Sequence, residues 1–188
     1  MPDQPSSTSS TVAQPAARDT IVQPAARDTT VRLAAPDTIV RLAARGDGVT
    51  ADGRHVPGAA PLDQVDADGA IHPGPHHATP PCRHYGDCGG CQLQHVADPA
   101  LAEFARDRVL APLARLGIVP EAVQEPHLSP PASRRRAVLR PARTKGEVRL
   151  GFNAMAEHRI VDLGECPVLH PALERLIGPL RQLLAPAL

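Results

Sequence analysis

The sequence contains few of the large side chains from which a protein core is built. It has no tryptophan, one tyrosine (Tyr85) and two phenylalanines (Phe104 and Phe152) among 188 residues. Proline and glycine occur 22 and 14 times, and both interrupt regular structure. Much of the apolar content is alanine, which buries little area. We therefore expect a modest folded part beside a long irregular part.

Long apolar runs are also missing. No stretch reaches the roughly 20 apolar residues that cross a membrane. The first residues, MPDQPSSTSS, lack the basic start and apolar run of a secretory signal. We expect no membrane contact and a cytoplasmic location, where thiols stay reduced. In that setting clustered cysteines indicate metal or redox chemistry rather than disulfides.

Charge is balanced overall but segregated along the chain. The 20 basic and 20 acidic side chains cancel. Residues 1–100 nevertheless carry 7 basic and 11 acidic side chains, whereas residues 134–159 carry 8 basic and 2 acidic ones, a local charge of +6. A segment of this kind can present a face that binds a polyanion, although it can also be an ordinary solvated surface.

The N-terminal region is a nine-residue repeat. Residues 14–49 read QPAARDTIV, QPAARDTTV, RLAAPDTIV and RLAARGDGV. Each block offers too few large apolar side chains for a stacked core, so we interpret residues 1–40 as low-complexity repeats, mostly disordered. The blocks look like extra copies of the first strand of a small β module at 41–65, where Gly46 to Gly48 and Asp52-Gly53 are turn signals. Residues 66–81 are predicted to be a linker.

The cysteines follow the spacing C-x5-C-x2-C, then 74 residues, then Cys-Pro. Three ligands on one loop and one distant ligand are typical of an iron–sulfur cluster. Two neighbouring glycines, Gly89 and Gly90, suit a loop that wraps closely around such a group. Zinc is an alternative that would recruit His84, His95 or His170. Two disulfides, in three connectivities, and a thioredoxin-type redox pair are weaker alternatives.

The segments CRHYGDCGGCQLQHV (82–96) and LGECPVLHP (163–171) resemble the RNA uracil-C5 methyltransferases, which make 5-methyluridine in ribosomal and transfer RNA. The resemblance is strongest to the 23S ribosomal RNA branch, which carries a [4Fe-4S] cluster. It implies that the cluster ligands here are Cys82, Cys88, Cys91 and Cys166. Residues 41–61 resemble the opening of the family's RNA-binding TRAM domain, and residues 129–169 resemble the start of its central α/β region.

The resemblance also implies features that the sequence does not show. The reaction needs S-adenosylmethionine, but no D/E-x-x-x-G-x-G pattern is present to bind it. It also needs a nucleophilic cysteine, yet all four cysteines are assigned as ligands. We therefore expect the N-terminal part of such an enzyme, with no catalytic residue. S-adenosylmethionine would be bound only by a separate or missing C-terminal half, and this polypeptide alone would transfer no methyl group.

Residues 82–188 are predicted to be the iron–sulfur and RNA-binding region. Periodicity predicts a helix from Asp98 to about Leu116, with an apolar face and a kink at Pro112. Strands are predicted at 137–139, 147–153 and 159–163. An apolar stripe runs over 171–184, broken at Gly178-Pro179. The expected fold class is α+β: a repeat tail, a partial TRAM-like β module, the iron–sulfur loop, and a small antiparallel sheet with flanking helices.

The resemblance and the local charge together assign contacts with RNA, expected to be ribosomal RNA, to the basic segment. The residues are Arg134, Arg135, Arg136, Arg140, Arg143, Lys145 and Arg149. Two other functions remain open. One is a stand-alone RNA-binding metal module without catalysis, and the other is a redox or electron-transfer iron–sulfur protein.

Overall fold

The computed structural model describes residues 36–187. The disorder predicted for residues 1–40 therefore concerns a segment that lies almost wholly outside the described residues. The end of that segment forms strand β1 (Asp37–Leu42), which begins with the Asp-Thr-Ile-Val tail of the third repeat block. The prediction of disorder is therefore wrong for residues 37–40, and whether the earlier blocks are copies of this strand stays a prediction.

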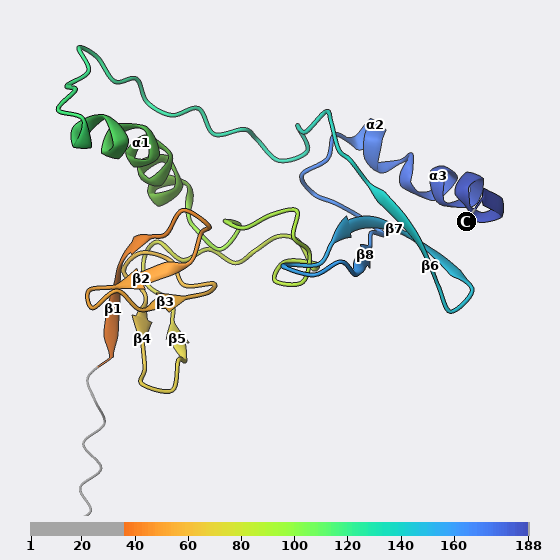
Figure 1. Ribbon diagram of the computed structural model, residues 1–188, viewed down its shortest axis with the longest axis horizontal. Helices are drawn as coiled ribbons and strands as arrows, with labels where there is room; N and C mark the ends of the chain where they lie inside the picture. The colour runs from red at the N-terminus through yellow and green to blue at the C-terminus, as the bar shows by residue number, and fades with distance from the viewer. Residues whose placement is uncertain (1–35, 188) are drawn as a thin grey trace, which may run out of the picture. The chain divides into compact units, whose positions relative to one another are not determined.

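Strands β1 to β5 form an antiparallel sheet in the order β3-β2-β1-β4-β5 (Figure 1). The remaining strands are β2 (Gly48–Thr50), β3 (His55–Val56), β4 (Gln64–Val65) and β5 (Ile71–His72). Strand β5 lies within the range expected to be a linker. The core of this sheet is small, because it consists of Ile39, Val56, Ala59 and Val65 with Ile71 against them.

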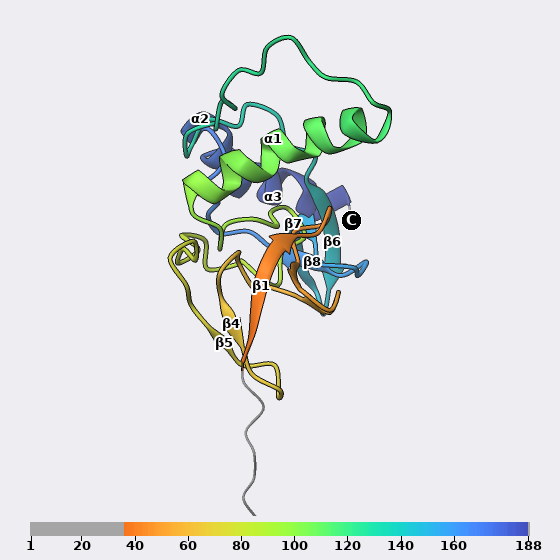
Figure 2. The ribbon, with the colours of Figure 1, turned by 90° about the vertical axis from the view of Figure 1, so that its left-hand side faces the viewer.

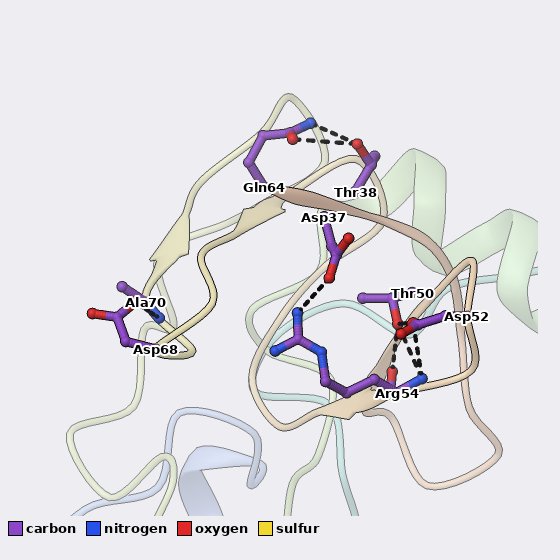
Figure 3. A network of polar contacts seen from close by, with 8 residues as sticks. All are labelled: Asp37, Thr38, Thr50, Asp52, Arg54, Gln64, Asp68 and Ala70. Carbon is purple, nitrogen blue, oxygen red and sulfur yellow. Dashed lines mark hydrogen bonds and ion pairs between the residues drawn. The ribbon is translucent and has the colours of Figure 1, made fainter. Parts of the chain in front are cut away.

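Polar contacts tie the central strand β1 to both of its sides (Figure 3). Arg54 Nη2 lies 2.8 Å from Asp37 Oδ2. On the other side, Gln64 Nε2 donates to Thr38 Oγ1 at 2.9 Å. The buried Thr50 accepts from the Arg54 backbone amide at 3.0 Å. These contacts supplement an apolar core that has few large residues.

Helix α1 spans Asp98–Arg115, as the sequence predicts, and Pro112 lies in its last turn without ending it. Its N-terminal half packs on the first sheet, because Ala100 is buried with Leu42, Ala60 and Val96, and Leu101 and Phe104 lie against this group. The predicted apolar face is not buried throughout. Val109 is 63% exposed and Leu116 is 75% exposed.

A second antiparallel sheet has the order β6-β7-β8. Strands β7 (Glu147–Asn153) and β8 (Ile160–Asp162) agree with the prediction. The predicted strand at 137–139 is wrong, because β6 occupies Arg140–Thr144. The β6–β7 hairpin turns at Lys145 and Gly146, whose φ angles of 51° and 86° are both positive, and this turn fixes which residues pair.

Helices α2 (Pro171–Glu174) and α3 (Ile177–Leu184) follow, and a short 3-10 helix, η1 (Ala185–Ala187), comes last. The predicted break at Gly178-Pro179 is wrong, since Pro179 lies in the first turn of α3, where a missing amide hydrogen is tolerated. Helix α3 lies beside β7 (Figure 2). The shared core contains Leu150, Leu163, Cys166, Leu169 and Ile177. The mixed helix and sheet content confirms the α+β class.

None of the helices between residues 36 and 187 is long and apolar enough to cross a membrane.

Candidate metal centre

Three cysteines that are close in sequence and the distant Cys166 line one small cavity. Their neighbours in its wall include His84, Tyr85, Gln94, Arg134 and Phe152. Cys88 and Cys166 are each 8% exposed, and Cys82 and Cys91 are half-buried. All four are free thiols in the structure, so the disulfide alternative finds no support. The cavity therefore concentrates four soft sulfur ligands at one place.

The loop that carries three of these cysteines is docked on the β7–β8 hairpin. Gly89 N donates to Asn153 O at 2.9 Å, and Met155 N donates to Asp87 O at 2.8 Å. Cys88 and Ala154 form an isolated antiparallel bridge. The Asp87 carboxylate accepts from the Arg159 guanidinium, which holds the pKa of Asp87 below its usual value. Backbone pairing and an ion pair thus fix the loop on the sheet.

The fourth cysteine follows β8 and is positioned by backbone hydrogen bonds. Cys166 N donates to Glu174 Oε1 at 2.8 Å. The residues after it pair in parallel with an upstream segment: Arg134 N donates to Val168 O at 3.0 Å, and His170 N donates to Arg134 O at 3.0 Å. The same pairing that positions Cys166 therefore also positions Arg134.

The two glycines of the loop allow the close approach expected of them. Gly90 N lies 3.4 Å from Cys88 Sγ and donates to it. A Cβ atom at Gly90 would lie 3.1 Å from the Phe152 ring and 3.4 Å from Cys88 Sγ. A Cβ atom at Gly89 would lie 3.0 Å from Asn153 O. Side chains at these positions would push the loop away from the hairpin.

The cavity disfavours thiolates unless something compensates their charge. Burial raises the pKa of Cys88, and the neighbouring Cys91, Cys82 and Cys166 raise it further, whereas the Gly90 amide lowers it. Burial likewise raises the pKa of Cys91, against hydrogen bonding from Gln94 and the positive charge of Arg134. Metal binding requires deprotonated cysteines, so a cation in the cavity would supply the missing compensation.

Two polar atoms at the cavity have no hydrogen-bond partner among residues 36–187. His84 Nε2 and Gln94 Oε1 are buried without a hydrogen bond, although both side chains line the wall. The other two histidines considered as zinc ligands have different roles. His95 contacts the Tyr85 hydroxyl and lies 3.2 Å from Ala59 O, and His170 Nδ1 accepts from Ala172 N at the start of α2. Of the three, only His84 lies at the cavity.

The arrangement differs from a site for a single ion. Within residues 36–187, no three histidine, cysteine, aspartate or glutamate side chains group tightly enough to hold one metal ion. A tetrahedral zinc site draws its sulfurs to about 2.3 Å from the metal. The four thiols nevertheless all line one cavity.

The basic residues assigned to RNA are divided among several places. Arg134 lines the cysteine cavity, and its guanidinium carbon lies 6.0 Å from the Phe152 ring centroid. Arg134, Arg135 and Arg136 are all exposed. Arg143 Nη1 donates to Gly146 O at 3.2 Å, and its Nη2 donates to Ala185 O. Arg143 therefore joins the hairpin turn to the C-terminal helical segment.

The remaining three basic residues lie on the hairpin. The β6–β7 register pairs Arg140 with Gly151 and Ala142 with Arg149, which places Arg140 and Arg149 on one face of the sheet. Lys145 is exposed at the turn. Arg140 also lines an open groove of about 470 Å³, together with Gly90, Phe152 and Asn153. A polyanion on this face would meet these residues but not Arg143.

Sequence reasoning did not identify Gln94 as part of the site, and it assigned Arg134 a different role. Gln94 lies three residues after Cys91, a short distance that could have indicated a donor to that sulfur. For Arg134 no such signal exists, because its place depends on the long-range pairing with Val168 and His170.

Comparison with known proteins supports the resemblance read from the cysteine motif. The chain is 40% identical over 141 residues to an uncharacterised RNA methyltransferase of Zymomonas mobilis. The matched region covers 75% of this chain and 36% of that relative. It is 42% identical over 123 residues to the 23S rRNA (uracil(1939)-C(5))-methyltransferase RlmD of Halomonas elongata. That match covers 64% of this chain and 26% of the relative.

A third relative, an uncharacterised RNA methyltransferase of Caulobacter vibrioides, is 38% identical over 161 residues. No protein-family model matches the chain. The matched regions span about a quarter to two fifths of the length of these three relatives. The predicted resemblance to RNA methyltransferases is confirmed.

Proposed function

We propose that this chain, a homologue of RNA methyltransferases, is the RNA-recognising and [4Fe-4S]-binding part of an RNA uracil-C5 methyltransferase that acts on 23S ribosomal RNA. The observation that carries this proposal is the convergence of Cys82, Cys88, Cys91 and Cys166 on one cavity. The cysteine spacing and the named relatives point to the same family. The proposal places the protein in the cytoplasm, where ribosomal RNA is modified.

The residues at the cavity fit an iron–sulfur cluster. Four free thiols provide one ligand for each iron. The Gly90 amide donates to one of these sulfurs, Cys88 Sγ. Hydrogen bonds of this kind stabilise thiolates. The cluster would link the loop at residues 82–91 to the segment after β8, and so complete a fold whose apolar cores are small.

The first sheet, residues 37–72, is proposed to be a TRAM-like RNA-binding module. The face of the second sheet that carries Arg140 and Arg149 is proposed to contact RNA phosphates. The exposed Arg135, Arg136 and Lys145 would add to this contact. Arg143 binds carbonyl groups of its own chain, so we propose a weaker contribution from it.

No residue of this chain is proposed to be catalytic. Every cysteine lines the cavity, and a thiolate bound to iron cannot also attack a uridine. S-adenosylmethionine would be bound by the part of a complete enzyme that corresponds to the remaining length of its relatives. That part could be carried on a separate polypeptide, which would then be the partner of this one.

Anaerobic purification followed by iron and sulfide assays tests the cluster. The proposal predicts iron and acid-labile sulfide in equal amounts and a broad absorbance band in the visible range. A chain that folds with zinc, or with no metal, would contradict it. RNA binding is tested separately with 23S ribosomal RNA fragments at several salt concentrations, because phosphate contacts weaken as salt rises.

Measurements of methyl transfer and of cluster reduction, together with the RNA-binding test, distinguish the two rival functions. A stand-alone RNA-binding metal module would bind RNA but restore no methyl transfer when mixed with a methyltransferase half. An electron-transfer protein would show reversible cluster reduction without affinity for RNA. Transfer of labelled methyl groups by the 188-residue chain alone would refute the absence of catalytic residues.

A further inference from the structure

Arg134 occupies a position that differs from that of the other basic residues in its segment. It is the residue with a permanent positive charge among those that line the four-cysteine cavity. Its guanidinium also lies over the Phe152 ring, with 6.0 Å from the guanidinium carbon to the ring centroid. Phe152 is itself part of the cavity wall.

The backbone fixes this arrangement. The Arg134 amide and carbonyl both pair with the segment that follows Cys166, at 3.0 Å to Val168 and 3.0 Å to His170. Residues 134 and 169 form an isolated parallel bridge. The backbone contacts that position the fourth cysteine therefore also hold Arg134 beside the ligands. Arg134 and Arg135 are both exposed, but of the two only Arg134 lines the cavity.

The other charged groups near the ligands are already paired. Glu174 accepts the Cys166 amide hydrogen, and Arg83 and Glu165 form an ion pair with each other. Four thiolates would add four negative charges to this cavity, and a nearby cation would offset part of that charge. We propose that Arg134 is the charge partner of the cluster: its guanidinium stabilises the reduced, more negative state and so raises the reduction potential.

This inference rests on the proposed cluster and assigns one residue a role in tuning it. Net charge near the cluster and solvent exposure are established determinants of iron–sulfur potentials. Removing one adjacent positive charge disfavours the added electron. The reduction potential of the bound cluster should therefore fall in a variant without that positive charge. It should not fall in a variant that keeps the charge.

The experiment compares Arg134→Gln, Arg134→Lys and the matched control Arg135→Gln in the anaerobically purified full chain. The readout is one-electron reduction by a chemical reductant, followed at defined potentials by the loss of visible absorbance. In R134Q the ratio of reduced to oxidised cluster at a fixed potential should fall at least tenfold, which corresponds to about 59 mV for a one-electron couple. R135Q and R134K should stay close to the unmodified chain.

Two results would overturn the inference. One is an R134Q variant that retains iron, sulfide and the potential of the unmodified chain. The other is an R134K variant that loses the cluster as readily as R134Q, because shape rather than charge would then be required. A loss of the cluster in R134Q alone supports the inference, since the charge would then be needed for assembly. An unmodified chain without iron and sulfide would instead contradict the proposed function itself.

Discussion

Arg83 Nε lies 3.1 Å from Glu165 Oε1, and this ion pair joins the residue after Cys82 to the residue before Cys166. The two side chains are 62% and 55% exposed. Exposed pairs of this kind contribute about 0–1 kcal/mol to the free energy of folding. The pair is thus a weak link between two segments that carry proposed ligands. Removing it can be compared with removing a ligand from the same segment.

Replacing Cys166 with serine should abolish cluster binding, whereas replacing its neighbour Glu165 with glutamine should not. Serine keeps the size of cysteine but removes the soft sulfur that binds iron. Iron and sulfide assays on both variants check this prediction. In E165Q the free energy of unfolding should change by no more than about 1 kcal/mol. An unchanged cluster in C166S would exclude this residue as a ligand.

Ile39→Thr should destabilise the first sheet. Ile39 is 0% exposed and lies in the core with Val56 and Val65, so a hydroxyl there would be buried and apolar contact would be lost. The expected loss is about 2 kcal/mol or more. The corresponding residue of the second repeat block is Thr30, so this variant also tests whether that sequence can form β1.

The matched control for this variant is Val40→Thr, at a neighbouring position that is 53% exposed. Its free energy of unfolding should change by less than about 0.5 kcal/mol. Denaturant titration of both variants gives the comparison. Equal losses in the two variants would contradict the assignment of Ile39 to the core.

Gly151→Ala should disrupt the pairing of β7 with β8. A Cβ atom at Gly151 would lie 1.9 Å from Val161 O, which no local adjustment of a side chain can relieve. Overpacking typically costs about 1–3 kcal/mol, and more where backbone must move. Thermal unfolding measures the effect. Gly178→Ala in α3 is the control, because no atom lies within 4 Å of its Cβ position and alanine favours the helix.

The pKa of His72 should lie above its usual value of 6.5. His72 Nε2 lies 2.8 Å from Asp66 Oδ2, and this hydrogen bond, with the charge of Asp66, favours the protonated ring. Because the pKa is raised in the folded state, the associated stability is fully present below 6.5 and is lost as pH rises through the folded value. Histidine NMR titration of the chain measures the pKa directly.

Two variants identify the origin of this shift. Asp66→Asn should return the pKa of His72 toward 6.5, whereas Asp68→Asn should have a smaller effect, because Asp68 acts only through its charge and more weakly. A raised pKa that survives in D66N would show that the hydrogen bond is not its cause.

Local sequence patterns predicted the helices and strands whose own residues show the pattern of that structure. The alternation of Val148, Leu150 and Phe152 predicted β7, and Asp98-Pro99 marked the start of α1. Strand β6 was misplaced because its residues, RPART, have little apolar alternation. Its structure depends on pairing with β7 across the Lys145-Gly146 turn. That two-residue turn was the signal available in the sequence.

The candidate site was predictable only where its residues form a local sequence pattern. The spacing of the cysteines and the glycine pair pointed to a shared ligand set, and the structure brings all four thiols to one cavity. The position of Arg134 was not predictable, because it depends on pairing with Val168 and His170 more than thirty positions away. A charge count cannot separate Arg134 from its neighbour Arg135, which is also exposed but does not line the cavity.

X-ray absorption at the iron edge of the anaerobically purified chain tests the central claim most directly. The account predicts iron surrounded only by sulfur, with other irons at short distance, because four cysteines would each bind one iron of a shared cluster. A single metal ion with nitrogen as well as sulfur neighbours would contradict it, and would point to zinc-like binding in which His84 joins the cysteines.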